Sequence, residues 1–392
     1  MTDFETLRAW WAHRQGLDGR FAGNTAADTL AATGWARSVG GSAPYLGLFA
    51  RAGLDRSAVD AEVADLAVHE LPSARGCTYV LPSQDFALGL AVGAGAPEGE
   101  IASAAKHLGV PADEVDRLCV EVVAALDKAD GPLDPAAIKA ATGDAVRNLG
   151  DAGRKRGVTT TLPLALGILQ ARGEIRRVPV NGRLDQQRYG YVTWSASPAD
   201  RETALAELAR RYFDWAGPAS LKHVRWFAGC TATAAKAAVA ELDLVPVPDT
   251  DLLLPADLRA EFDAFTRPTN PHYTLVAAID GIHLLHRDLP RLLDTEDAAR
   301  PVPAGKPGRT LGDEADPPTP VIVDRGRIVG LWEFDPDEGE IVYQAFIPET
   351  DDLRAAIDRT QSFVVDQLGD VRSVSLDSPT SRKPRLAALR AA

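Results

Sequence analysis

The sequence predicts an α+β fold in which groups of helices are followed by β-hairpins, and the clearest group spans residues 113–194. Its helices are predicted from apolar residues at helical spacing, and its hairpin from Asn181-Gly182 between two β-rich runs. Thr160 or Thr161 is expected to cap the third helix, with Pro163 in its first turn, where a missing N–H costs nothing. The predicted helices are 113–129, 135–141 and 162–172, and the predicted strands are 174–180 and 183–192.

Three helices and a hairpin are the outline of a winged helix, whose third helix and hairpin wing contact nucleic acid. Less regular groups of the same kind are predicted on either side, with Thr25 and Thr231 each expected to cap one of their helices. The chain is therefore a degenerate internal repeat. We therefore expect three tandem winged-helix modules and a C-terminal β-barrel-like part with a helix. The predicted domains are residues 1–99, 100–198, 199–258 and 259–392.

The C-terminal part is expected to contain a hairpin at residues 321–334 and a final strand at 371–376. Residues 295–319 are rich in Pro, Gly and acidic residues and predict an exposed loop. The basic tail is either an arm that contacts phosphate or, the interpretation we favour, a disordered end. Its basic residues are Arg382, Lys383, Arg385 and Arg390.

Basic residues surround the third helix and the wing of the 113–194 group, as expected for phosphate binding. They are Arg154, Lys155, Arg156, Arg176, Arg177 and Arg183. The expected outward positions of the third helix are Leu164, Gly167, Gln170 and Ala171. Only Gln170 makes good base-edge contacts, so the protein would find shape or damage rather than sequence. Changing Arg176 and Arg177 to Ala should then flatten the salt dependence of binding by about two units. The alternative is a solvated surface on an ordinary α/β module.

The composition is that of a globular protein, but it limits the kind of partner. The 392 residues are 45% hydrophobic and 25% charged, with a formal net charge of −13 and a pI of about 5.1. This acidity disfavours a protein that coats DNA non-specifically, while it leaves room for a locally basic groove. Abundant Ala, Arg, Asp and Gly with a single Met suggest a high-GC bacterial source.

The sequence also lacks the signatures of several chemistries. Cys77, Cys119 and Cys230 are scattered without metal-ligand spacing, and their odd number suits a reducing cytoplasm. There is no P-loop, dinucleotide fingerprint or Gly-x-Ser-x-Gly motif, so no cofactor and no metal are expected. No leader pattern and no membrane-spanning apolar run are recognisable, and we expect a cytoplasmic protein.

Short motifs follow one another along nearly the whole chain in a characteristic order. They are Leu7-Arg8-Ala9-Trp10, Ala43-Pro44-Tyr45-Leu46-Gly47-Leu48-Phe49-Ala50-Arg51, Arg75-Gly76-Cys77-Thr78-Tyr79-Val80, Ile279-Asp280 with Arg287, and Val323-Asp324-Arg325-Gly326-Arg327-Ile328-Val329-Gly330-Leu331-Trp332. This order resembles the AlkZ/YcaQ-type bacterial DNA glycosylases, which remove bulky alkylated bases and unhook interstrand crosslinks. The resemblance implies three winged helices around a concave DNA channel. It adds Arg37, Arg75 and Arg287 to the expected DNA contacts.

The catalytic motif departs from the pattern of that family. The family has a Gln-x-Gln or Gln-x-Asp pair just before the Pro-Tyr-Leu segment, where it holds the water that attacks the sugar C1′. This chain has Arg37-Ser38-Val39 there. In the expected lesion-facing loop, residues 37–45, Ser38 is the side chain able to hold a water, because Arg37 only donates and Val39 is apolar.

A carboxylate elsewhere would have to replace the missing pair, since general acid–base help contributes about 100- to 10,000-fold. The candidates are Glu70, Asp85 and Asp280. Each also has a structural explanation. Glu70 fits a strand edge, Asp85 the start of a helix, and Asp280 a helix cap or a partner of Arg287.

Three functions remain open. The first is a monomeric protein that binds double-stranded DNA and acts on bulky or N7-alkylated purines or interstrand crosslinks in DNA repair. The second is a catalytically silent winged-helix DNA-binding protein, such as a damage sensor or regulator. The third is a winged-helix scaffold for a small molecule or a protein, which the acidic charge favours. Salt-dependent DNA affinity would separate the first two from the third, and base release would separate the first from the second.

Overall fold

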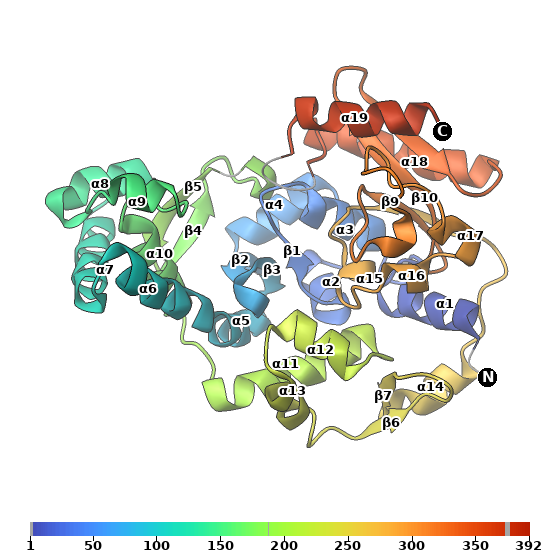
Figure 1. Ribbon diagram of the computed structural model, residues 1–392, viewed down its shortest axis with the longest axis horizontal. Coiled ribbons are helices and arrows are strands. Elements are labelled where there is room, and N and C mark those ends of the chain that lie inside the picture. The colour runs from blue at the N-terminus through green and yellow to red at the C-terminus, as the bar shows by residue number, and fades with distance from the viewer. Residues whose placement is uncertain (1–2, 187, 373–376) are drawn as a thin grey trace.

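The structure is a computed structural model that describes residues 3–186, 188–372 and 377–392. It is a mixed α/β protein with small antiparallel sheets (Figure 1). The names first, second, third and C-terminal segment refer below to residues 4–93, 95–193, 201–264 and 273–390. The second segment forms a lobe at the left of the view, and the C-terminal segment lies at the upper right. The first segment lies between these two and the third runs along the bottom of the view, so residues from distant parts of the sequence meet in the centre.

In the first segment, helices precede the hairpin β2–β3, as the sequence predicts. Thr25 caps α2, because its Oγ1 accepts a hydrogen bond from the backbone N of Asp28 at 3.0 Å. The sheet has the order β1-β3-β2, and Arg37 of β1 lies opposite Tyr79 of β3. The elements are α1 (Phe4–Arg14), α2 (Ala26–Thr33), β1 (Ala36–Arg37), α3 (Ala43–Ala52), α4 (Arg56–Ala64), β2 (Val68–Pro72), β3 (Thr78–Pro82) and α5 (Phe86–Gly93).

The second segment also shows the predicted order of helices and a hairpin. Thr161 precedes the third predicted helix, α10, but its side chain makes no cap; its Oγ1 accepts from the backbone N of Arg147 instead. The elements are α6 (Gly95–Leu108), α7 (Ala112–Asp127), α8 (Pro135–Thr142), α9 (Gly150–Arg154), α10 (Leu162–Ala171), β4 (Ile175–Pro179) and β5 (Tyr189–Thr193).

The turn of this hairpin is longer than predicted. Pro179 pairs with Tyr189, so residues 180–188 connect the strands rather than the two predicted residues alone. The physical reason is Leu184, which is fully buried in the core of the first segment. Its backbone N donates to Oη of Tyr45 at 3.0 Å. Burying this side chain outweighs the local preference for a tight turn.

Helix α10 is buried, which contradicts its prediction as an outward-facing recognition helix. Leu164 is 4% exposed and Gln170 8%, and Nε2 of Gln170 donates to the carbonyl O of Leu166 in the same helix. Helices α5, α6 and α7 pack around α10. An amphipathic pattern cannot distinguish an outer face from one that another helix covers, because both faces here are apolar or small.

The third segment repeats the order of helices followed by a short hairpin, β6–β7. Thr231 caps α13 as predicted, through a hydrogen bond from the backbone N of Ala234. The elements are α11 (Arg201–Ala216), α12 (Leu221–Ala228), α13 (Ala232–Ala238), β6 (Leu244–Pro246), β7 (Leu253–Pro255) and α14 (Arg259–Ala264).

The C-terminal segment is built on an antiparallel sheet. Among the described residues this sheet is four-stranded, in the order β11-β10-β9-β8, with no pairing between β11 and β8. The expected barrel-like closure is therefore not confirmed, whereas the predicted hairpin of residues 321–334 is. The elements are β8 (Tyr273–Val276), α15 (Gly281–Leu284), α16 (Leu289–Leu292), α17 (Thr295–Ala298), β9 (Val321–Asp324), β10 (Arg327–Asp335), β11 (Glu340–Ala345), α18 (Asp351–Phe363) and α19 (Pro379–Arg390).

The basic tail is an ordered helix, α19, so the predicted disordered end is wrong. Arg382 is fully buried, donates to the carbonyl O of Phe334 and Val371, and pairs with Asp370 at 2.7 Å. The Phe334 carbonyl lies 48 residues away in the sequence, so the local composition of the tail did not reveal this contact. Part of the predicted last strand, residues 373–376, lies outside the described residues.

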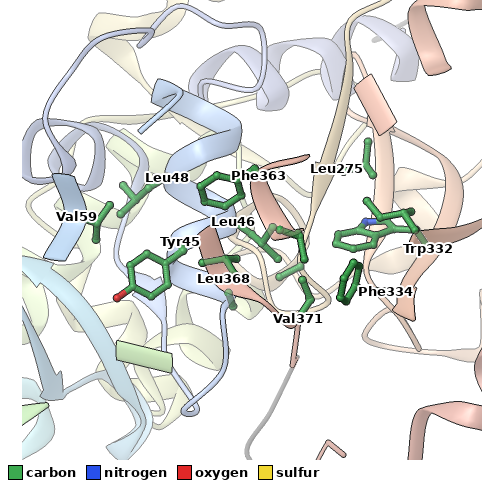
Figure 2. Packing of buried hydrophobic residues seen from close by; sticks show 14 of the residues in the cluster. Tyr45, Leu46, Leu48, Val59, Leu275, Trp332, Phe334, Phe363, Leu368 and Val371 are labelled. Atoms are coloured by element: carbon green, nitrogen blue, oxygen red, sulfur yellow. The ribbon is translucent and has the colours of Figure 1, made fainter. Parts of the chain in front are cut away.

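The first and C-terminal segments share a core (Figure 2). The side chains labelled there are Tyr45, Leu46, Leu48, Val59, Leu275, Trp332, Phe334, Phe363, Leu368 and Val371. The rings of Phe49 and Phe363 stack at 4.0 Å between centroids. The second segment instead has an apolar cluster of its own, drawn from residues between 101 and 191. The predicted domain boundaries remain predictions, but these cores show which segments depend on one another.

Candidate nucleic-acid interface

A cavity of about 390 Å³ lies where the first, third and C-terminal segments meet. Arg37 of β1, Arg75 of the β2–β3 turn and Arg287 after α15 line it, together with Trp226 of α12. The guanidinium carbon of Arg75 lies 4.0 Å from the ring centroid of Trp226, and that of Arg287 lies 4.9 Å away. The cavity therefore combines cationic groups with an aromatic ring, the pairing that binds phosphates and stacked bases.

The backbone holds two of these arginines in an uncommon conformation. Arg75 has φ 60° and Arg287 has φ 48°, values that non-glycine residues seldom adopt. Gly229 ends α12 beside Arg75, and a Cβ on Gly229 would lie 2.8 Å from Cγ of Arg75. Residues keep such conformations where the surrounding structure fixes them, often at functional sites. The backbone conformation of Arg75 and the close approach of Gly229 therefore together fix Arg75 over Trp226.

The positive charge extends into a second cavity. This space of about 510 Å³ shares Arg75, Trp226 and Arg287 with the first, and Lys222 and Arg225 also line it. Burial lowers the pKa of Arg75, and the like charges of Arg287 and Arg37 lower it further. A protein with a net charge of −13 therefore concentrates cations at one place, which favours an anionic ligand there.

Carboxylates also line the first cavity. Asp316, in the segment before β9, pairs with the guanidinium of Arg287 at 3.0 Å. Asp377 pairs with Arg385 at 2.8 Å, and both residues lie at the edge of the cavity. The side chain of Asp316 is 42% exposed and that of Asp377 is 5% exposed. Asp316 is thus the more accessible of the two acidic groups.

Ser38 does not line this cavity. Arg37 and Val39 on either side of it do, whereas Ser38 is 1% exposed and its hydroxyl donates to Oε1 of Glu70. The alternation of side chains along an extended chain explains this arrangement. The predicted water contact at Ser38 is therefore occupied by Glu70, which is itself buried and pairs with Arg177 at 3.4 Å.

Arg177 faces the first segment rather than an open groove, and its neighbour Arg176 is partly buried. Arg177 donates to Oγ1 of Thr78 at 3.0 Å, and its guanidinium lies 4.8 Å from the ring centroid of Tyr189. Burial lowers the pKa of His69 to about 3, and the charges of Arg176 and Arg177 contribute. Arg177 thus holds the second segment against the first, which contradicts its prediction as a phosphate contact.

The other two predicted catalytic carboxylates are also engaged in structural contacts. Asp85 accepts from Nε1 of Trp35 at 2.8 Å and pairs with Arg211 at 3.2 Å. Asp280 caps α15, as one of its predicted alternatives stated, but its partner is Arg51, with both oxygens at 2.8 Å from guanidinium nitrogens. Burial raises the pKa of Asp280, but the charge and hydrogen bonds of Arg51 outweigh it and hold this pKa below its usual value.

The remaining predicted contacts fall into two groups. Arg154, Lys155 and Arg156 are exposed at the end of α9, on the lobe formed by the second segment. Arg183 instead pairs with Asp185 at 2.6 Å and donates to the carbonyl O of Leu368. These contacts fix the loop between β4 and β5, the wing loop, on the C-terminal segment. Arg183 is therefore not available as a phosphate contact in this arrangement.

Sequence reasoning missed Trp226, Lys222, Arg225 and Asp316. A tryptophan in an amphipathic helix usually belongs to the core, so Trp226 gave no separate signal. Lys222 and Arg225, close to an aromatic residue on one short helix, were the available sign of a nucleic-acid contact. Asp316 lies in a stretch rich in Pro and acidic residues, where no local pattern distinguishes one carboxylate from its neighbours.

Within the described residues, no three His, Cys, Asp or Glu side chains come together in an arrangement that would hold a metal ion. The helices in the same part of the chain are all too short or too polar to span a membrane.

Helix–hairpin segments around a cationic cavity with an aromatic wall have the features of proteins that bind nucleic acid. A model of the family described as DNA glycosylase AlkZ-like matches residues 27–361, and the chain belongs to this family. This confirms the resemblance found in the sequence. Among solved structures, Streptomyces sahachiroi DNA glycosylase AlkZ has a similar fold, with a TM-score of 0.69 and 20% sequence identity. The match covers 95% of this chain and 98% of that one. No curated protein matches the sequence.

Proposed function

We propose that this member of the AlkZ-like family binds double-stranded DNA as a monomer and takes an alkylated purine into the cavity of Arg37, Arg75, Arg287 and Trp226. The observation that carries the proposal is the contact of two guanidinium groups with one indole ring at the wall of that cavity. Arginines neutralise phosphates, and base–aromatic stacking contributes about 1–3 kcal/mol per base. We take the three helix–hairpin segments as winged helices that frame the DNA channel.

The mode of recognition follows from what the protein can present to DNA. Helix α10 is buried, so base edges are not read from it. Phosphate contacts position a protein without reading sequence. A base turned out of the stack by a bulky adduct has already lost part of its stacking energy, and selectivity for damage arises in this way. Bulky or N7-alkylated purines and interstrand crosslinks are the lesions that we propose.

The activity that we propose is hydrolysis of the glycosidic bond of these purines. An N7-alkylated purine is cationic, so it is already a good leaving group. A second candidate is a catalytically silent damage sensor, which is favoured by Arg37 and Val39 at the cavity wall. A guanidinium there repels the positive charge that develops on the sugar, and a valine side chain holds no water.

The test is fluorescence anisotropy with matched duplexes that carry guanine or 7-methylguanine, at several salt concentrations. We expect salt-dependent binding, tighter for the damaged duplex, and a loss of that preference in Trp226→Ala. Weak binding that salt does not change would favour the small-molecule or protein scaffold instead. Alkali-revealed abasic sites in a single-turnover incubation would separate the glycosylase from the silent sensor.

A further inference from the structure

We propose that Asp316 is the carboxylate that activates the attacking water in this chain. This inference rests on the proposed function, because it needs an alkylated purine in the cavity. It places the chemistry on the segment between α17 and β9, far in sequence from the loop 37–45.

The acidic residues singled out from the sequence are unsuitable by position. Glu70 accepts the Ser38 hydroxyl and pairs with Arg177, and all three groups lie away from the cavity wall. Asp85 and Asp280 are both buried, 0% and 6% exposed, and held in ion pairs. A group that takes a proton from water has to reach that water directly or through one further water molecule.

Asp316 meets this requirement. It lines the cavity together with the two prolines that follow it, and its side chain is 42% exposed. Arg287 donates to it from Nε, at 3.2 and 3.1 Å to the two oxygens, and its terminal nitrogen lies 3.0 Å from Oδ2. A guanidinium that contacts both oxygens fixes the orientation of the carboxylate. The charged or titratable groups around it also include Arg75 and His283.

The same arginine links this carboxylate to the proposed base-binding surface. The guanidinium of Arg287 lies 4.9 Å from the ring centroid of Trp226 while it holds Asp316. A base stacked at Trp226 therefore has its sugar within the same cavity as the carboxylate. Asp377, the other carboxylate at the cavity, accepts from both Arg385 and Ser381 and is 5% exposed, so it is less able to reach a water.

The water oxygen forms a bond to C1′ of the sugar as the bond between C1′ and N9 of the purine breaks. The electron pair of that bond neutralises the cationic N7-alkylated purine, which leaves as a neutral base. Asp316 accepts the proton that the water loses and releases it to solvent. Its negative charge also offsets the positive charge that develops on the sugar, amid the surrounding arginines.

The test compares Asp316→Asn with Glu314→Gln under single-turnover conditions on a duplex with 7-methylguanine. Glu314 is a matched control because it is acidic, lies two residues away and pairs with Arg309 outside the cavity. We expect Asp316→Asn to slow base release by about 100- to 10,000-fold, as for loss of general base help. Its DNA affinity should be unchanged or higher, because a negative charge among arginines is removed. Glu314→Gln should match the wild type.

Base release by Asp316→Asn within threefold of the wild-type rate would overturn the inference. Absence of base release by the wild type would overturn it as well. The anisotropy experiment would then show separately whether the protein binds damaged DNA. If Asp316→Asn also weakens binding, the deciding measurement is base release by Asp316→Ala with added formate. Restored base release with formate but not with chloride supports the carboxylate role, and no restoration overturns it.

Discussion

The salt dependence of DNA binding tests the cavity most directly, through the double variant Arg75→Ala/Arg287→Ala. Each phosphate contact contributes about 0.9 to the slope of log affinity against log salt. If both arginines contact phosphate, the variant should lose about 1.8 from this slope. Between 50 and 200 mM salt, a fourfold change, its affinity should therefore fall about 12-fold less than that of the wild type. Anisotropy of a labelled duplex measures both slopes.

The matched control removes two arginines on exposed helices away from the cavity, Arg117→Ala/Arg354→Ala. Both side chains are more than half exposed and pair with acidic neighbours. This variant changes the net charge by the same amount as the test variant. Because neither arginine lies at the cavity, its slope should equal that of the wild type. An unchanged slope in Arg75→Ala/Arg287→Ala, or an equal loss in the control, would refute the placement of DNA at the cavity.

Three further predictions concern stability. Arg51→Met leaves the buried Asp280 carboxylate without its counter-charge. It should lower the free energy of unfolding, measured by urea titration, by about 3–5 kcal/mol. An unchanged urea midpoint would contradict the ion pair. Leu184→Ala should cost about 2–5 kcal/mol and increase hydrogen exchange in the wing loop, because this leucine is fully buried beside Tyr45; exchange like that of the wild type would show that the loop is not docked. Burial raises the pKa of Glu333 to about 7, so the folded state keeps a proton that the unfolded state loses above about pH 4.5. Stability from this group is therefore lost as the pH rises from about 4.5 to 7, and Glu333→Gln should gain up to about 3 kcal/mol relative to the wild type over that range in denaturant titrations; a pH-independent difference would contradict the raised pKa.

Much of the order of elements was predictable, because helix periodicity and caps are local properties. Thr25, Thr231 and Asp280 were each predicted as possible helix caps, and each accepts a backbone N–H at a helix start. Burial of α10, the docked wing loop and the ordered tail were not predictable. Each depends on contacts outside the local sequence, as the bonds from Leu184 to Tyr45 and from Arg382 to the carbonyl O of Phe334 show.

The residues of the candidate site were predictable only in part, because the site is assembled from several segments of the chain. Arg37, Arg75 and Arg287 were assigned through the resemblance, and the structure brings them to one cavity. Arg177 was assigned by its charge and its place in the predicted wing, and neither reveals that a buried glutamate lies opposite. Whether the exposed residues 154–156 contact DNA stays a prediction, which the slope of the corresponding triple variant would test.

The shared core of the first and C-terminal segments has a consequence for synthesis on the ribosome. Phe49 stacks on Phe363, so the first segment waits for about 300 further residues before its core can close. At about 5–20 residues per second, this interval is roughly 15–60 s. The second segment has its own apolar cluster and can fold within that time. During the same interval the first segment exposes the apolar surface that the C-terminal segment later covers, and such surface makes a nascent chain prone to aggregation.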